Sequence, residues 1–143
     1  MLDRRSLEGV FHLVHALKRH LFQQAEQLSL CITPMHIRVI KIIDRKKPCT
    51  AIDIASFLGR DKAQVTRLVS TLLEKGFITK KPNPNDKRSH YLCITDSGAE
   101  IVKKIDDIDA VTVQIMTKNI TPEELSEFQR ISQLMAENLS SPE

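Results

Sequence analysis

Hydrophobic residues recur with the spacing of an α-helix along most of this chain. Over residues 5–28 they follow three- and four-residue steps, which predicts an amphipathic helix with an apolar face at Leu7, Val10, Phe11, Val14, Leu17 and Leu21. The next segment opens with Thr33 and Pro34, a favourable N-cap and a favourable first helical residue, and Pro48 ends it. Its apolar positions are too dense for a one-sided surface helix, so we expect it to be buried on two sides.

Two short helical segments follow with little chain between them. The first has Thr50 as its cap, Asp53 three residues later in the manner of a capping box, and Gly59 as its stop. The second is capped by Asp61 and stopped by Gly76, and its inward stripe is Val65, Leu68, Val69, Leu72 and Leu73. About three residues, including a glycine, separate the two, which is the connection of a helix-turn-helix.

The stretch GFITKKPNPNDKRSHYLCIT, residues 76–95, changes to the composition of β-strands. FITKK and HYLCIT carry the β-branched and aromatic residues that strands favour, and PNPND between them is typical of a turn. The connection is longer than an ordinary hairpin requires, and Lys87 and Arg88 lie near its tip. A helix-turn-helix closed by such a hairpin is a winged helix, with the basic loop as its wing.

Helical spacing returns after the hairpin. Thr95 opens a long helix that we expect to reach about residue 118, and TPEE at 121–124 opens a last one. The expected fold is therefore mostly α with a small β-hairpin wing (α+β). We predict an N-terminal dimerisation helix at 1–32, a winged helix-turn-helix DNA-binding domain at 33–96, and C-terminal dimerisation helices at 97–143. A small central domain cannot cover the apolar faces at both ends of the chain, which favours a two-fold symmetric homodimer.

The distribution of charge adds a partner to this picture. The net charge is only +3, but residues 33–94 hold thirteen Lys/Arg against five Asp/Glu, while residues 95–143 hold four against ten. A basic centre beside an acidic C-terminal third is typical of a nucleic-acid-binding unit attached to another element. The N-terminus does not resemble a signal peptide, and no apolar run is long enough to span a membrane, so we expect a cytoplasmic protein.

The second helix of a helix-turn-helix enters the major groove of DNA with its N-terminal half leading. Projection of this helix places Arg67 opposite the apolar stripe, where a guanidinium can read guanine or clamp a phosphate. Gln64 can pair with adenine, Thr66 can reach a phosphate or a thymine methyl, and small Ala63 allows close approach. The candidate DNA-binding residues of this helix are Lys62, Ala63, Gln64, Thr66, Arg67 and Ser70.

The wing supplies a second set of candidates. Lys87 and Arg88 can follow phosphates or enter the minor groove. Asp86 cannot attract DNA, so we expect it to hold Arg88 in position through a charge-assisted hydrogen bond, which is compatible with turn-capping.

Several of these segments together carry a resemblance. ITPMH, VTRLVSTLLEKGFI, ITDSG at 94–98 and the wing pattern N-P-x-D-x-R at Asn83, Pro84, Asp86 and Arg88 resemble the MarR family of bacterial transcriptional regulators. The resemblance covers nearly the whole chain. It implies a homodimer with interlocking first, fifth and sixth helices. It also implies a pseudo-palindromic operator that is often released when a small phenolic or other anionic ligand binds.

The resemblance also assigns roles to individual positions. It places Ala63, Thr66, Arg67, Asp86 and Arg88 at DNA-contact or wing-positioning sites. Three positions depart from the family pattern: Asn83 replaces the usual leading Asp of the wing, Ala63 replaces a frequent Ser, and His36 stands where a Gln is common. The expected function is a sequence-specific double-stranded DNA-binding transcriptional regulator, acting as a repressor. The alternative is a winged-helix module for protein assembly, which would show little salt-dependent binding to DNA.

The sequence gives little indication of catalysis or metal binding. The chain has no nucleophile motif or Gly-rich phosphate loop and is too short to add a catalytic domain, so we predict no enzyme activity and no cofactor. His12 and His15 share a helical face, but no further ligand type lies near, and we predict no metal site.

The three cysteines have no C-x-x-C spacing and are read as free thiols. Cys31 and Cys49 precede the helix caps Thr33 and Thr50, where a helix N-terminus could lower a thiol pKa, so a redox switch stays open as an alternative. Cys93 is expected to be buried within a strand and inert.

Overall fold

The computed structural model describes residues 3–29 and 31–141 of the chain. The elements in chain order are α1 (Arg4–Gln27), α2 (Pro34–Arg45), α3 (Ala51–Leu58), α4 (Lys62–Glu74), β1 (Ile78–Pro82), β2 (His90–Ile94), α5 (Asp96–Met116) and α6 (Pro122–Ser140). This order confirms the predicted fold, a mostly α-helical chain with one small β-hairpin.

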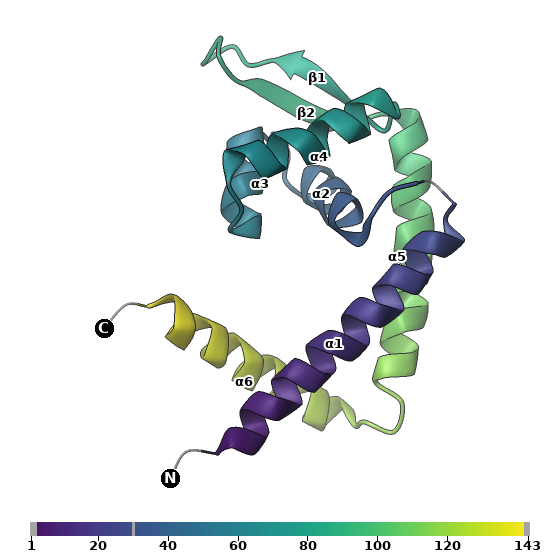
Figure 1. Ribbon diagram of the computed structural model, residues 1–143, viewed down its shortest axis with the longest axis vertical. Helices are drawn as coiled ribbons and strands as arrows, with labels where there is room; N and C mark the ends of the chain where they lie inside the picture. Colours follow the sequence, from purple (N-terminus) through teal and green to yellow (C-terminus); the bar gives the residue numbers. More distant parts are fainter. Residues whose placement is uncertain (1–2, 30, 142–143) are drawn as a thin grey trace. The chain divides into compact units, whose positions relative to one another are not determined.

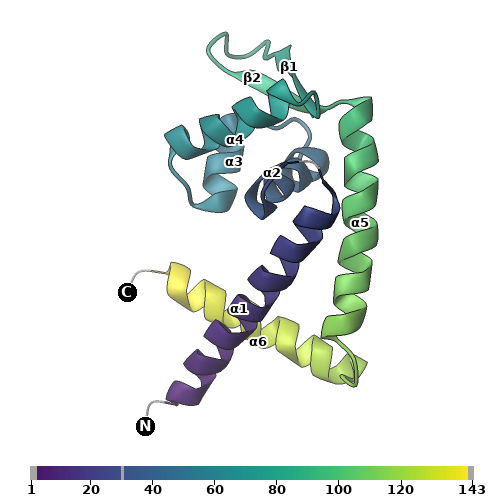
Figure 2. The same cartoon turned by 45° about the vertical axis from the view of Figure 1, so that its right-hand side comes forward.

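The core of the winged domain forms around α2. Its Val39, Ile40 and Ile43 are completely buried, which agrees with the prediction of a helix covered on two sides. Helices α3 and α4 pack against α2, and the β1–β2 hairpin lies beside α4 (Figures 1 and 2). The buried cluster continues through Ile54 and Leu72 into the first residues of β1.

The hairpin is antiparallel, with Ile78 opposite Ile94 and Pro82 opposite His90. Its apolar end lies in the core, since Ile78 and Leu92 are buried, while its far end is exposed. The Leu92 amide also donates to the Cys49 carbonyl oxygen at 2.8 Å, which ties the connection between α2 and α3 to β2. The wing is therefore fixed at its base and projects from the domain.

The predicted caps form as the local sequence indicates. The side chains of Thr50 and Asp61 accept backbone amides at the starts of α3 and α4. Gly59 and Gly76 adopt left-handed backbone angles, with φ of 60° and 77°, just after the helices that they stop. Both ends of the helix-turn-helix are therefore fixed by residues adjacent in sequence.

The chain divides into two compact units, Met1–Asp106 and Asp107–Glu143. The first contains α1 and the winged domain, and the second contains the end of α5 and all of α6. Exposed apolar side chains are numerous on the end helices: Phe11 of α1 is 66% exposed and Phe128 of α6 is 51% exposed. Within the described ranges, no helix has both the length and the apolar character of a membrane span.

Candidate nucleic-acid interface

Helix α4 presents one buried face and one exposed face. Val65, Val69 and Leu72 are buried, as predicted, whereas Leu68 and Leu73 are only half-buried and mark the edges of the stripe. The residues predicted from sequence to contact DNA lie on the other side of the helix. Gln64 is half-buried, and the exposed members are Lys62, Ala63, Thr66, Arg67 and Ser70.

Local hydrogen bonds decide which groups of α4 are available to a ligand. The backbone amide of Gln64 donates to Asp61 Oδ1 at 2.8 Å, which caps the first turn of α4. The Thr66 hydroxyl donates to the Lys62 carbonyl oxygen at 2.8 Å, so its methyl group and its acceptor lone pairs are what it offers outward. Among the described residues, no hydrogen bond or ion pair engages the Arg67 guanidinium, and all five of its N–H donors are available.

An open hollow lies beside α4, between this helix and the start of α2. Its walls include Gln64, Arg67 and the half-buried Leu68. It therefore adjoins the side of α4 that carries the predicted DNA contacts, which we call the candidate reading face. Gln64 and Arg67 were predicted from the sequence to contact DNA. Arg60, which lies between the last residue of α3 and the N-cap of α4, was not. The complete lining is Met35, His36, Arg60, Gln64, Arg67, Leu68 and Thr71.

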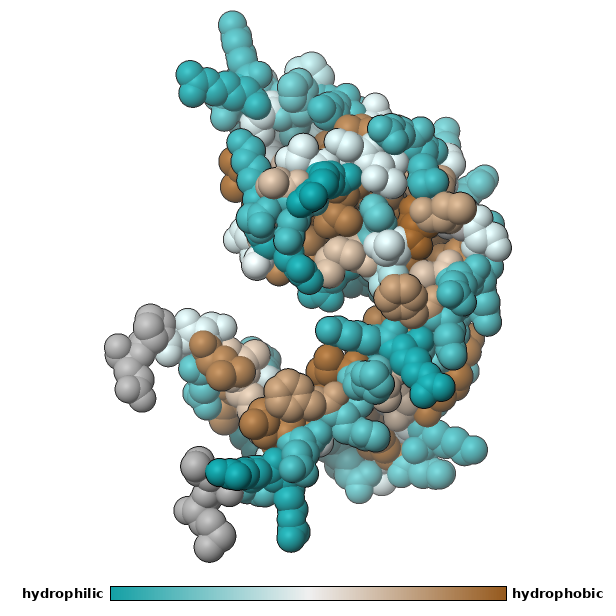
Figure 3. Space-filling view, in the orientation of Figure 1, coloured by the Kyte–Doolittle hydropathy of each residue, from teal (hydrophilic) through white to brown (hydrophobic). Residues whose placement is uncertain are grey.

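The tip of the wing is shaped by two short side chains. Asn83 Oδ1 accepts a hydrogen bond from the backbone amide of Asn85 at 3.0 Å. Asp86 Oδ1 accepts one from the backbone amide of Arg88 at 2.9 Å. The Asp86 carboxylate thus contacts Arg88 through the backbone, as a turn cap does, and the structure shows no bond between it and the Arg88 guanidinium. The role of Asp86 in positioning Arg88 for DNA stays a prediction. Lys87 and Arg88 are exposed, and hydrophilic side chains project from this end of the molecule (Figure 3).

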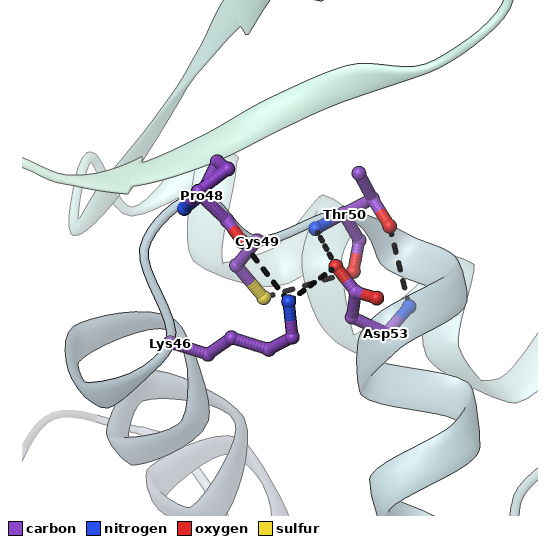
Figure 4. A network of polar contacts seen from close by, with 5 residues as sticks. All are labelled: Lys46, Pro48, Cys49, Thr50 and Asp53. Atoms are coloured by element: carbon purple, nitrogen blue, oxygen red, sulfur yellow. Dashed lines mark hydrogen bonds and ion pairs between the residues drawn. The ribbon is translucent and has the colours of Figure 1, made fainter.

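The first helix of the helix-turn-helix is anchored by a polar network at its N-terminus (Figure 4). Asp53 Oδ2 accepts the Thr50 amide at 2.9 Å and forms an ion pair with Lys46 at 3.4 Å. Lys46 also donates to the Pro48 carbonyl oxygen at 3.3 Å. The hydrogen bond from the Thr50 backbone lowers the pKa of Asp53, which keeps the carboxylate ionised. The network joins the end of α2 to the start of α3.

The cysteines require two corrections to the sequence-based expectations. Cys49 is completely buried, and burial, reinforced by the negative charge of Asp53, raises its pKa to about 11 instead of lowering it. Cys93 is half-buried, so it is more accessible than predicted. Cys31 is exposed. Across the described ranges, no group of three or more His, Cys, Asp or Glu side chains is arranged to hold a metal ion.

Known proteins resemble this chain in sequence and in fold. A family model described as the MarR family matches residues 32–90. The multiple antibiotic resistance protein MarR of Escherichia coli is 31% identical over 122 residues, covering 84% of this chain and 83% of that protein.

Solved structures extend the match to three dimensions. A MarR protein from Peptoclostridium difficile superimposes with a TM-score of 0.85 at 24% identity, covering 97% of this chain and 90% of that one. A mutant MarR from Escherichia coli complexed with operator DNA superimposes with a TM-score of 0.77 at 27% identity, covering 91% and 93% of the two chains. Since the similarity to the Escherichia coli regulator spans most of both chains, this chain belongs to the MarR family of transcriptional regulators.

Proposed function

We propose that this DNA-binding transcriptional regulator reads its operator with α4 in the major groove and with the wing on the adjacent backbone. The observation that carries the proposal is the division of α4 into a buried face and an exposed face that presents Arg67. The solved Escherichia coli relative complexed with operator DNA supports the same use of the fold. Several relatives that this chain matches are named as transcriptional regulators, a role that is not enzymatic in general.

The residues of α4 have distinct roles in this proposal. Arg67 reads guanine O6 and N7 with its guanidinium fork, and Gln64 reads adenine from the flank of the helix. Thr66 offers a methyl group to thymine, since its hydroxyl proton is held by the helix backbone. The small side chain of Ala63 allows α4 to approach the base edges closely. Lys62 and Ser70, at the margins of the exposed face, contact phosphates.

The wing supplies affinity that is largely independent of sequence. Lys87 and Arg88 neutralise phosphates or enter the minor groove next to the major-groove site. Asp86 holds the backbone at Arg88, which sets the direction in which that side chain leaves the turn. The wing therefore fixes the register in which α4 meets the bases.

We also propose that the chain acts as a homodimer, with residues 33–96 as the DNA-binding domain. The exposed apolar side chains of residues 1–32 and 97–143, such as Phe11 and Phe128, would be buried between the two copies. Two-fold symmetry then presents two copies of α4 to half-sites about 34 Å apart, one turn of DNA. The operator is accordingly pseudo-palindromic, and binding there represses transcription in the cytoplasm.

Release of the operator by a small anionic or phenolic effector completes the proposed mechanism. Such a ligand acts only if it binds the DNA-free form more tightly than the DNA-bound form. DNA must then weaken effector binding by the same factor. Titration of a preformed complex with simple phenolic acids, monitored by fluorescence anisotropy of the DNA, tests this part.

The central experiment is selection of duplex fragments from a random pool by the purified full-length protein, followed by sequencing. We expect enrichment of an inverted repeat whose half-sites are one helical turn apart. Binding of the selected duplex should weaken steeply as salt rises, because phosphate neutralisation releases counterions. Failure to enrich any sequence, or an affinity independent of salt, would refute the proposal and favour an assembly role for the winged domain.

A further inference from the structure

Helix α2 begins with a capping box in which the partner of the N-cap is a histidine. The Thr33 amide donates to His36 Nδ1 at 3.0 Å, and the His36 amide donates to Thr33 Oγ1 at 3.4 Å. The Thr33 hydroxyl lies 2.8 Å from the same ring nitrogen. The boxes that open α3 and α6 use the carboxylates of Asp53 and Glu124 in this place. The box of α2 thus has an imidazole as its partner, which becomes a cation on protonation, where the other two boxes have a carboxylate.

The hydrogen bond from the Thr33 backbone amide to His36 forms only when Nδ1 of the ring carries no proton. His36 Nδ1 must accept the Thr33 amide, so in the closed box the ring proton lies on Nε2. A proton on Nδ1 would place a donor against the amide donor of Thr33 and would leave only Thr33 Oγ1, 2.8 Å away, as an acceptor. It would also put a positive charge at a helix N-terminus, where the helix dipole disfavours cations. Protonation of His36 therefore opposes the contact that begins α2.

The surroundings of His36 keep the ring neutral at physiological pH. His36 is half-buried, and burial followed by the positive charge of Lys75 lowers its pKa. The charged groups that share its hollow, Arg60 and Arg67, are also cations. Among the described residues of α1, α3, α4 and the hairpin, no carboxylate forms an ion pair with His36 to offset them.

The box lies beside the exposed face of α4 that carries Gln64 and Arg67. His36 and Met35 line one wall of the hollow, and Gln64 and Arg67 of α4 line another. Just before the N-cap, Cys31 has a φ of 53°, a left-handed angle that a residue with a side chain adopts at a cost in free energy. Met35 and His36, which form this wall of the hollow, both lie in the first turn of α2.

We propose that His36 is a positioning residue that makes DNA binding sensitive to acid, with the closed box required for the DNA-binding arrangement of α2 and α4. Acid opens the box and weakens binding, and DNA, which selects the closed box, expels the proton from His36. The inference rests on the proposed function and adds a regulating condition to it. It does not require contact between His36 and DNA.

The test compares the wild-type chain with His36→Gln across pH. Glutamine accepts in a capping box as histidine does but does not titrate. The full-length proteins are titrated with a duplex selected from the random pool, at constant ionic strength, from about pH 8 to about pH 5, a range that spans histidine titration. We expect equal affinities at the alkaline end. At the acidic end, the wild type should bind about five-fold more weakly than His36→Gln, the factor that a typical N-cap contributes.

A matched control separates this effect from the general titration of histidines. His12→Gln removes a histidine from α1, and its pH profile should follow that of the wild type in samples that light scattering shows to have the wild-type oligomeric state. Profiles of wild type and His36→Gln that superimpose across the whole range would overturn the inference. A wild type that gains affinity in acid relative to His36→Gln would overturn it as well.

A second measurement examines the box without DNA. Nitrogen-15 NMR of the ring should show the hydrogen on Nε2 at neutral pH. Exchange of the Thr33 amide, corrected for its intrinsic rate, should accelerate as the ring is protonated in the wild type but not in His36→Gln. A ring with its hydrogen on Nδ1 would refute the proposal. A Thr33 amide exchange rate that does not change when the ring is protonated would refute it as well. If no duplex binds at about pH 8, the proposed function itself fails, and the ring measurements still decide whether acid opens the box.

Discussion

Gly98, in the first turn of α5, lies so close to the carbonyl oxygen of Phe77 that a Cβ atom at residue 98 would stand 2.0 Å from it. The same atom would be 3.0 Å from Cγ2 of Ile94. Around this contact, the Thr95 amide donates to the Phe77 carbonyl oxygen at 3.1 Å, and the Thr95 hydroxyl donates to the Gly76 carbonyl oxygen at 2.6 Å. The start of α5 is therefore bound to the segment that leaves α4, and a side chain at residue 98 has no room.

Gly98→Ala should destabilise the protein by about 1–3 kcal/mol, the usual cost of overpacking, because a backbone atom blocks the new methyl group. Chemical denaturation followed by circular dichroism measures this change. Gly9→Ala is the matched control, since no described atom lies within 4 Å of a Cβ built at residue 9 of α1. There, alanine should be neutral or stabilise by about 0.5–1 kcal/mol. Equal effects of the two variants would contradict the close contact at residue 98.

Much of the winged domain could be predicted because its determinants are local in sequence. A cap and its amide partner lie within three residues, as with Asp61 and Gln64. An apolar stripe needs only the helical period, so Val65, Val69 and Leu72 were placed correctly and the exposed face of α4 followed by exclusion.

The features that the sequence did not predict depend on residues distant along the chain or on unusual chemistry. The requirement for glycine at residue 98 depends on Phe77, which precedes it by a strand, a loop and another strand. The burial of Cys49 depends on the covering strand β2, whereas the cap beside it is visible in sequence. His36 was noted only as a departure from a family pattern. The usual capping-box rule counts Glu and Gln as partners, so it overlooks an imidazole nitrogen that can accept the same amide.

Arg67→Ala should weaken binding of the selected duplex by about 1–3 kcal/mol and relax the preference at one base pair of each half-site. Arg67→Lys should recover non-specific affinity but not that preference, because an ammonium lacks the bidentate fork. Fluorescence anisotropy with the cognate duplex and with single-base variants distinguishes the two effects. Arg45→Ala, which removes an exposed cation from the far end of α2, controls for loss of charge alone. An Arg67→Ala protein with unchanged affinity and unchanged preference would remove Arg67 from the interface.

Arg88→Ala should lower affinity for all sequences and reduce the slope of log K against log salt by about one unit for each phosphate that is no longer neutralised. Asp86→Ala should weaken binding similarly even though it removes a negative charge, because the Arg88 amide then lacks the acceptor that lies 2.9 Å away in the wild type. Asp86→Asn keeps a side-chain oxygen at this position and should restore most of the binding. If Asp86→Ala instead binds more tightly, the carboxylate acts by repelling DNA and its positioning role is wrong.

The cysteines should differ widely in their reactivity toward a thiol reagent in the native protein. Cys49 should remain unmodified up to about pH 9, because it is completely buried and its thiolate forms only near its pKa of about 11. Exposed Cys31 should react first, and Cys31→Ser should abolish that first phase. Peptide mass spectrometry after timed quenching assigns each modification. Rapid native-state labelling of Cys49 would reopen a redox role for the α2–α3 connection.

Phe128→Glu should convert the protein to a monomer and sharply reduce its affinity for a duplex that carries both half-sites. The reason is that Phe128 belongs to an apolar face of α6 that is exposed in the single chain, where Phe128, Ile131 and Met135 are 51%, 37% and 43% exposed. A carboxylate there would have to lose its hydration on dimerisation without a partner charge. Light scattering gives the oligomeric state, and the same samples can be titrated with one-half-site and two-half-site duplexes.

The control for Phe128→Glu is Phe57→Glu, which introduces the same charge at a phenylalanine of α3 that is 62% exposed. Because α3 belongs to the winged domain and not to the proposed dimerisation helices, Phe57→Glu should stay dimeric. Binding to a single half-site should be weak and similar for both variants, since each keeps its own α4 and wing. The advantage of the second half-site should disappear only in Phe128→Glu, because a dimer converts the second contact into an intramolecular one. A monomeric Phe128→Glu that keeps full affinity for the two-half-site duplex would show that the spacing of the recognition helices is not set by a dimer.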